Sequence, residues 1–305
     1  MFVRFAFGVV VFVLYSFPAL AGDFEKFTPG SGVNSEEFTS IVKSFKNATA
    51  VSYNNNDTKF EFQLNSELVD PRIVGGTATT VEKYPWQVAL LYGVVAEPQR
   101  VLRCGGSVIA PNWILTAAHC VADGTQEDAV SQATFYRVQG LRAKILKVIA
   151  HPQFNSDTLE NDVALLKVDT ALPDGSVVPI AAANIDIPDQ SSVYVTGWGA
   201  IFEGGPTSEI LRVAKMPLVA NSVCNAPESY NDKIKSGMMC AGYRDGGLDS
   251  CQGDSGGPAV VMEDGKPLLA GVVSFGEGCA RKLKYGVYTR VSSYADWIRQ
   301  TITTQ

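Results

Sequence analysis

Histidine is scarce in this sequence: its 305 residues contain two, His119 and His151. Any chemistry that needs an imidazole base therefore depends on one of these side chains. Charge is sparse too, with 18% charged residues and a net charge of −6, and the basic residues form no long run. Nucleic-acid binding needs a basic surface that displaces counterions, so we expect no nucleic-acid partner.

Long apolar runs are absent after the first residues of the chain. The one long run extends from Phe5 to about Phe17, follows Arg4 and precedes an Ala-Leu-Ala sequence. A positive start, a short apolar run and a small-x-small site are typical of a secretory signal peptide. We therefore expect residues 1–21 to be a signal peptide. The mature protein should be secreted and extracellular, with no membrane partner.

Cysteine is missing from residues 22–72, and all six cysteines lie further along the chain. In an oxidising compartment an even number favours disulfides, and the count alone leaves the pairing open. No cysteines and histidines have the spacing of a zinc site, so we expect no metal. The six are Cys104, Cys120, Cys224, Cys240, Cys251 and Cys279.

Residues 22–72 are polar and also lack tryptophan and histidine. Both N-x-Ser/Thr sequons of the chain lie there, at Asn47 and Asn56, and we expect them to be glycan sites on exposed backbone. Composition alone leaves three interpretations of this segment open: a small domain, a linker or a removable pro-segment.

From residue 73 onward, short runs rich in Val, Ile, Leu, Tyr and Thr alternate with Gly, Pro, Asn and Asp. A long amphipathic helix is indicated only at Tyr294–Ile302. Many short strands without intervening helices indicate an all-β sandwich or barrel. The predicted strands are Trp86–Leu91, Ser107–Ile109, Lys144–Ile149, Val163–Val168, Val193–Thr196, Ala270–Val273 and Gly286–Val291.

Three residue types that carry chemistry stand in separate motifs. His119 lies in Thr-Ala-Ala-His-Cys, Asp162 opens an apolar run, and Ser255 lies in Gly-Asp-Ser-Gly-Gly-Pro. A serine hydroxyl needs a base to become a nucleophile, and glycines on both sides let backbone N–H groups converge on one point. Taken singly, each has a structural reading: a satisfied histidine, a turn aspartate and a loop.

Together these motifs resemble the trypsin branch of the chymotrypsin-like serine proteases. The Ile-Val-Gly-Gly sequence at Ile73, the run around His119, Asp162 and the run around Ser255 occur in that family's order. The likeness extends from Ile73 to about Ile302, roughly three quarters of the chain. It implies an all-β fold of two antiparallel β-barrels packed side by side, with a C-terminal helix and a division near residues 180–192.

The resemblance also implies roles for the site residues. Ser255 attacks the scissile carbonyl, and His119 takes its proton and returns it to the leaving amine. Asp162 holds the imidazole tautomer and is braced by Ser274. The N–H groups of Gly253 and Ser255 form the oxyanion hole. No cofactor is implied.

Specificity follows from Asp249, which matches the floor of the family's substrate pocket. A buried carboxylate there favours a cationic partner, so we expect cleavage after Arg or Lys. Gly276 and Gly286 match the pocket walls, Ser250 offers a hydroxyl to a lysine ammonium, and Ser274 lines the substrate channel. Protein inhibitors of proteases are expected partners besides protein and peptide substrates.

The resemblance identifies Arg72–Ile73 as an activation bond. It implies a pro-segment at 22–72 and a protease domain at 73–305. The freed ammonium of Ile73 pairs in the family with the carboxylate that matches Asp254. The implied disulfides are Cys104–Cys120, Cys224–Cys240 and Cys251–Cys279.

Departures from the family pattern are few. Phe275 and Leu102 replace a common tryptophan and histidine, and the loop after His119 lacks the glutamates of calcium-binding trypsins.

A catalytically dead homologue and a carbohydrate-binding β-protein are the rival interpretations. The first usually loses a triad residue, which this chain keeps, and the second leaves the motif order unexplained. Modulation by sodium stays open.

Overall fold

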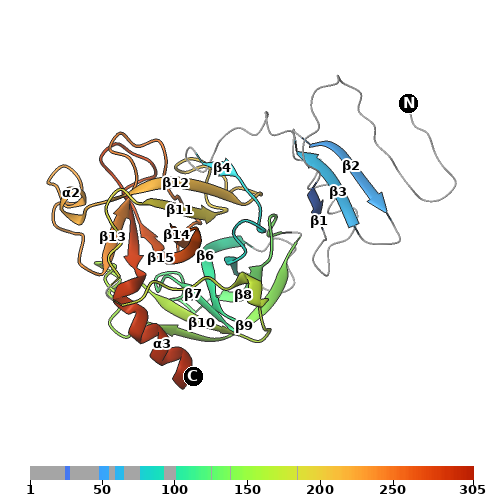
Figure 1. The fold of residues 1–305 in the computed structure, drawn as a ribbon, viewed down its shortest axis with the longest axis horizontal. Coiled ribbons are helices and arrows are strands. Elements are labelled where there is room, and N and C mark those ends of the chain that lie inside the picture. Colours follow the sequence, from blue (N-terminus) through green and yellow to red (C-terminus); the bar gives the residue numbers. More distant parts are fainter. Residues whose placement is uncertain are drawn as a thin grey trace. The chain divides into compact units, whose positions relative to one another are not determined.

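Figure 1 shows the computed structural model of the chain. It describes residues 76–92, 101–124, 126–137, 139–183 and 185–305, together with three strands between residues 25 and 64. The predicted signal peptide, the sequons at Asn47 and Asn56, and the predicted activation bond Arg72–Ile73 lie outside the described residues.

The chain divides into two compact units, of which the smaller is Met1–Asp70 with Arg137–Gly140. Its strands are β1 (Glu25–Phe27), β2 (Ala48–Asn54) and β3 (Lys59–Leu64), and they form an antiparallel sheet in the order β1-β3-β2. The sequence of β3, Lys-Phe-Glu-Phe-Gln-Leu, alternates polar and apolar residues, a period that favours a strand. The sequence had left the structure of this segment open.

The larger unit, Pro71–Tyr136 with Leu141–Gln305, begins with a closed antiparallel barrel. Its strands are joined in the order β10-β7-β6-β5-β8-β9. The core-facing positions of these strands carry Val, Ile and Leu, as the pleat requires when alternate side chains point inward. The bounds are β5 Gln87–Tyr92, β6 Val101–Ala110, β7 Trp113–Thr116, β8 Gln126–Ser131, β9 Leu141–Ala150 and β10 Ala164–Val168.

A second closed barrel follows in the order β11-β14-β15-β16-β13-β12, and β11 pairs with β12 to close it. The short strand β4 (Thr77–Ala78), which precedes the first barrel in the chain, adds to the edge of β12 in the second. The bounds are β11 Ser192–Gly197, β12 Arg212–Val219, β13 Met238–Ala241, β14 Pro258–Glu263, β15 Lys266–Phe275 and β16 Gly286–Arg290.

The two barrels share an apolar interface. Val260, Leu269 and Val272 of the second barrel belong to the same buried cluster as Val88 and Leu165 of the first. Removing this apolar surface from water stabilises the pair by about 25 cal/mol per Å². The barrels therefore meet along a continuous core, and loops from both converge at its edge.

In the part of the chain that the structure describes, helices are short and peripheral. They are η1 (Asp174–Ser176) between the barrels, α2 (Asn221–Cys224), η2 (Val291–Tyr294) and α3 (Ala295–Thr304) at the C-terminal end. Helix α3 buries Ile298 against the first barrel, although it follows the last strand of the second (Figure 1). In the described part of the chain, no helix is long and apolar enough to span a bilayer.

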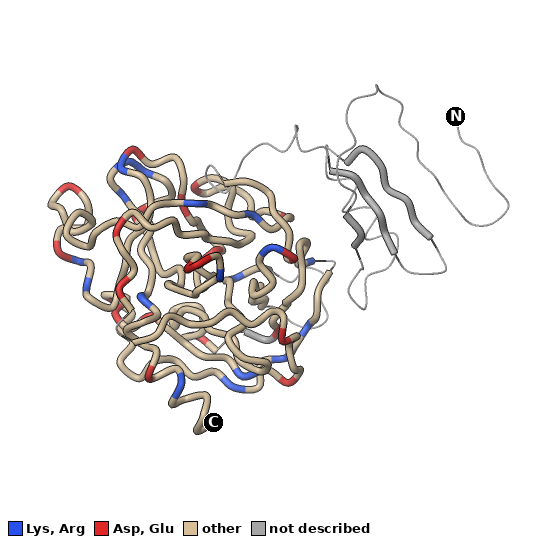
Figure 2. Tube along the Cα trace, viewed as in Figure 1, with Lys and Arg blue, Asp and Glu red and all other residues tan. Residues whose placement is uncertain are grey.

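The predicted all-β fold of two antiparallel barrels with a C-terminal helix is confirmed, and each predicted strand overlaps an observed one. Basic and acidic residues are interspersed along the described trace, in keeping with the absence of a basic run in the sequence (Figure 2).

Candidate active site

His119 and Asp162 form a hydrogen-bonded pair at the end of the first barrel. His119 follows β7, and Asp162 precedes β10, which pairs with β7 in the sheet. His119 Nδ1 lies 2.7 Å from Asp162 Oδ2, and the backbone N–H of His119 donates to Oδ1 at 2.9 Å. This contact favours the tautomer with the proton on Nδ1, in which Nε2, 3.7 Å from Cys120 Sγ, carries the lone pair of a base.

Asp162 has no exposed side-chain surface, so its carboxylate needs polar partners. One comes from the second barrel, where Ser274 Oγ donates to Oδ2 at 2.5 Å. Thr289 Oγ1, also of the second barrel, donates to the backbone carbonyl of Asp162 at 2.6 Å. Asn161, just before it, has a φ of +58°, a conformation that asparagine tolerates well. Asp162 is thus oriented by both barrels.

His151 occupies a different environment. Its ring lies 5.4 Å from the Tyr294 ring and 5.0 Å from the Trp297 ring, centroid to centroid. Its Nδ1 accepts from the backbone N–H of Gln153 at 3.3 Å, and burial lowers the pKa of His151 below its ordinary value. Of the two histidines, His119 is the one that has a buried carboxylate behind it.

Ser255 lies in the loop between Cys251 and β14. Its carbonyl accepts from the N–H of Gly105 at 2.7 Å, and Gly105 follows Cys104, whose disulfide reaches Cys120 next to His119. The serine is therefore held against strand β6, in which Cys104 is bridged to Cys120, the residue next to His119. Its Oγ makes no hydrogen bond to a described residue, which leaves the hydroxyl open to reaction.

The backbone N–H groups around Ser255 divide into two sets. Those of Asp254, Gly256 and Gly257 donate to backbone carbonyls at 2.7–2.9 Å. Those of Gly253 and Ser255 donate to no described residue. Gly253 has a φ of +96°, which requires a residue without a Cβ. The two remaining donors can bind an oxyanion that develops near the serine.

Asp254 is buried with an exposure of 1%. Its Oδ1 accepts from the N–H of Gly199 at 2.8 Å, and its Oδ2 from that of Cys251 at 3.0 Å. Burial raises the pKa of Asp254 to about 6, while these two bonds and the Arg212 guanidinium act in the opposite direction. The buried carboxyl is thus available to a cation.

Asp249 is also buried, with an exposure of 3%. Its Oδ2 accepts from the N–H of Ala280 at 3.0 Å, and its buried Oδ1 has no hydrogen-bond partner among the described residues. Burial raises the pKa of Asp249 to about 7, although the N–H groups of Ala280 and Ser250 lower it. A cation at Oδ1 would relieve this cost.

Glycines leave space beside Asp249. A Cβ at Gly286 would lie 2.6 Å from Asp249 Oδ1 and 2.8 Å from the Tyr288 hydroxyl, so a side chain there would collide with both. A Cβ at Gly276 would meet its nearest neighbour, the Gly278 carbonyl, only at 3.3 Å. Ser250 Oγ lies 3.5 Å from the Tyr288 hydroxyl.

Ion pairs involve the loop between β15 and β16. Lys284 Nζ lies 2.7 Å from Glu277 Oε2, and Arg281 Nε donates to Glu203 Oε2 at 2.8 Å. Phe275, at the end of β15, packs edge-on against the Tyr230 ring. Sequence reasoning missed both pairs and the contact of Thr289, because no local pattern marks them and the partners of Arg281 and Thr289 lie far away in the chain.

Three disulfides brace the site, and they are the pairs that the resemblance implies: Cys104–Cys120, Cys224–Cys240 and Cys251–Cys279. The first is adjacent to His119 and the third encloses Ser255. Cys104, His119 and Cys120 have ligand atoms within 4.8 Å of one another, but both sulfurs are consumed in the disulfide and cannot bind a metal as thiolates.

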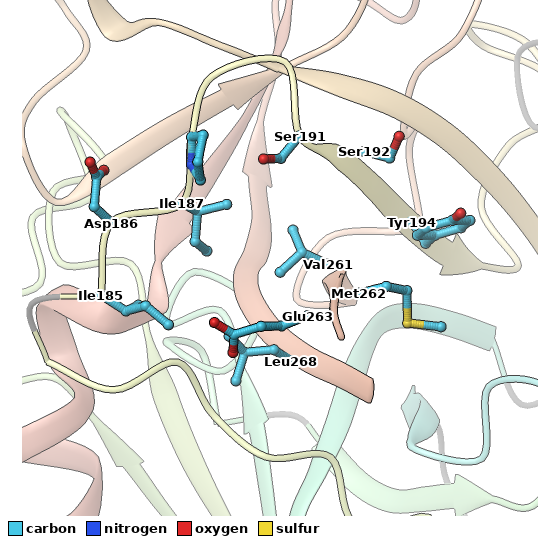
Figure 3. Close-up of a pocket in the computed structure, with 11 residues that line it drawn as sticks. Ile185, Asp186, Ile187, Ser191, Ser192, Tyr194, Val261, Met262, Glu263 and Leu268 are labelled. Atoms are coloured by element: carbon cyan, nitrogen blue, oxygen red, sulfur yellow. The ribbon is translucent and has the colours of Figure 1, made fainter. Parts of the chain in front are cut away.

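A pocket with a volume of about 260 Å³ lies elsewhere on the second barrel, between residues 185–192 and strands β14 and β15 (Figure 3). None of the predicted site residues lines it. Its wall combines aliphatic side chains with the carboxylates of Asp186 and Glu263.

In a comparison with known protein families, the family model described as trypsin matches residues 73–298, which include both barrels and the candidate site residues.

Proposed function

The chain belongs to the trypsin family of serine proteases, and from this premise we propose that it is a secreted zymogen which, once activated, cleaves peptide bonds after Arg or Lys. The observation that carries the specificity is the buried Asp249, whose Oδ1 has no partner among the described residues. An arginine or lysine side chain would supply the missing positive charge.

The proposed reaction begins at Ser255. As its Oγ attacks the scissile carbonyl, His119 Nε2 takes the hydroxyl proton, and the carbonyl electrons move to the oxygen. The oxyanion accepts hydrogen bonds from the N–H groups of Gly253 and Ser255, each typically worth ~100-fold or more in rate. Asp162, 2.7 Å from Nδ1, stabilises the imidazolium that forms.

Collapse of the tetrahedral intermediate breaks the C–N bond, and His119 gives its proton to the leaving amine. Water then attacks the acyl-enzyme with His119 again as the base, and the acid product leaves Ser255 regenerated. Ser274, besides bracing Asp162, and Gly276 lie on the strand and turn that we propose bind the substrate backbone. Ser250 would help to hold a lysine ammonium.

Activation is proposed at the Arg72–Ile73 bond. Cleavage would free an ammonium on Ile73, which would pair with the buried Asp254 and order the oxyanion hole beside it. The polar composition of residues 22–72 supports their assignment as a pro-segment that precedes a protease domain at 73–305. Arg72 itself suits the proposed pocket, which would allow self-activation.

Secretion is proposed on the N-terminal signal pattern of residues 1–21. Three disulfides in the described part of the chain support an oxidising destination. In that compartment Asn47 and Asn56 would be glycosylation sites, and protein inhibitors of proteases would be partners in addition to substrates.

A panel of peptide substrates with Arg, Lys, Phe, Leu or Ala before the cut tests the proposal, before and after limited cleavage at Arg72. We expect activity only after cleavage and only on Arg and Lys, with an active chain that begins at Ile73. Strong cleavage after Phe or Leu would refute the specificity, and an active chain with another first residue would refute the activation site.

A further inference from the structure

A buried guanidinium lies on the second barrel, outside the groups that the reaction uses. Arg212 is the first residue of β12 and has an exposure of only 4%. Arginine is rarely buried without strong polar partners, because its charge cannot be removed by deprotonation. Its burial therefore depends on polar partners, and these show which segments the guanidinium holds.

One partner of Arg212 is the backbone just after the proposed activation bond. Its Nη2 donates to the carbonyl of Gly76 at 2.7 Å. Next along the chain, Ala78 of β4 lies opposite Arg212 in the sheet, and the N–H of Thr79 donates to the carbonyl of Leu211 at 2.8 Å. The chain that leaves Gly76 is thus fastened to β12 from its first described residue onward.

Arg212 is also connected to Asp254, through its cross-strand neighbour Gly197. In the pairing of β11 with β12, Arg212 lies opposite Gly197. A Cβ at Gly197 would collide with Oδ1 of Asp254, so that carboxylate lies directly against the Gly197 backbone. Burial is the largest influence on Asp254 and raises its pKa, and the charge of Arg212 is among those that lower it. One guanidinium therefore acts on both the Gly76 segment and the Asp254 carboxylate.

Chain length connects these two contacts. Three residues, Ile73 to Gly75, separate the anchored Gly76 from the amine that cleavage would free, and they span roughly 10 Å when extended. Fixing the Gly76 carbonyl therefore limits the freed amine to within about 10 Å of this anchor, which is bound by the residue that lies opposite Gly197. A confined amine loses less entropy when it forms the pair than one on a free strand.

We propose that Arg212 is a positioning residue for activation: it holds the Gly76 carbonyl so that the new amino terminus is directed to Asp254. The inference rests on the proposed activation at Arg72–Ile73. It adds a residue of this chain that neither touches the substrate nor belongs to the reacting groups.

Carbamylation by cyanate tests the proposal on the activated enzyme. Cyanate adds to a free α-amine and not to one that is paired and buried, so the rate at which it inactivates the enzyme reports how often the Ile73 amine is exposed. We expect Arg212→Gln to increase this rate about tenfold, a size typical of coupling between sites. Arg212→Lys, which keeps the charge, should restore most of the protection.

Lys215→Gln is the matched control, because it makes the same cation-to-amide change at an exposed position on the same strand. Its cyanate rate should equal that of the wild type. If Arg212→Gln does not fold, Arg212→Met replaces it, since an apolar side chain of similar length is well accommodated in a core. N-terminal sequencing of each variant accompanies the rates.

A cyanate rate for Arg212→Gln equal to that of the wild type, with the chain beginning at Ile73, overturns the inference and leaves the proposed activation intact. A lower melting temperature with unchanged cyanate protection does the same, because it reduces Arg212 to a structural residue. An active chain that begins elsewhere refutes the activation site itself, and is seen by sequencing before any rate is measured.

Discussion

Ser274 Oγ donates a hydrogen bond of 2.5 Å to Asp162 Oδ2, and this bond crosses from the second barrel to the first. The acceptor oxygen is the one that also contacts His119 Nδ1. The position of the imidazole therefore depends on a hydroxyl of the opposite barrel. Thr289 reinforces the arrangement through the backbone carbonyl of Asp162.

Removal of that hydroxyl should impair turnover more than binding. We expect Ser274→Ala to lower kcat about tenfold with a change in KM of less than about threefold, because a hydrogen bond to a charged group contributes roughly 1.5–3 kcal/mol. Steady-state kinetics on an Arg peptide provide the measurement. Thr289→Ser keeps the second hydroxyl and should retain wild-type kcat. A Ser274→Ala enzyme with unchanged kcat would show that Asp162 is oriented without it.

The triad should behave as one unit. Each of Ser255→Ala, His119→Ala and Asp162→Ala is expected to reduce kcat by about 10⁴-fold or more, and the double variants should lose little beyond the worse single variant. Pre-steady-state burst measurements on an ester substrate give the acylation rate directly. Additive losses in the double variants would contradict a shared proton-transfer step.

Binding of a cation in the pocket should depend on pH through Asp249. Burial raises the pKa of this carboxyl to about 7, so it takes up a proton as the pH falls through that value and loses its attraction for a cation. The inhibition constant of benzamidine, an arginine mimic, should rise about tenfold per pH unit below pH ~7 and stay flat above it.

Asp249→Asn is the control for that titration, because its pocket floor carries no ionisable group. Its inhibition constant should be high and independent of pH between about pH 5 and 8. The same dependence on pH in the wild type and in Asp249→Asn would assign the titration to another group, such as Asp254, whose pKa burial raises to about 6.

The two wall glycines should respond differently to a methyl group. At Gly286 a Cβ would lie 2.6 Å from Asp249 Oδ1, whereas at Gly276 the nearest described neighbour is 3.3 Å away. We therefore expect Gly286→Ala to lower kcat/KM on Arg peptides by about 100-fold or more, and Gly276→Ala to have a clearly smaller effect. Thermal unfolding of both variants separates loss of the pocket from loss of the fold. Equal effects at the two positions would place the substrate side chain away from Asp249.

Local pattern was enough to predict seven of the twelve barrel strands that the structure describes. Val163–Val168 is almost continuously apolar, and it lies buried as β10. Strand β8 (Gln126–Ser131) begins with Gln-Glu-Asp and shows no apolar run, so nothing in its sequence indicated a strand. Strand β12 contains Pro217, which interrupts the pattern that sequence reasoning relies on.

His119 and Ser255 could be singled out as candidates from their own motifs, and the resemblance supplied their expected roles. Residues that act through distant partners could not be singled out in this way. Ser274 was assigned a role only through the family resemblance, and Thr289, 127 residues from Asp162, was not assigned at all. Arg212 looks like an ordinary solvent-facing cation in the sequence, and its burial follows from the addition of β4 to the edge of β12.

Because the hydrogen bond between Ser274 and Asp162 joins the two barrels, catalytic activity depends on how the barrels pack against each other. A relative displacement of the barrels by about 1 Å would lengthen this bond beyond hydrogen-bonding distance while every strand keeps its own ladder partners. During heating, activity should therefore disappear before the circular dichroism signal of the strands does. In this molecule a loss of function can precede any loss of secondary structure, because the reacting groups belong to an interface and not to either barrel alone.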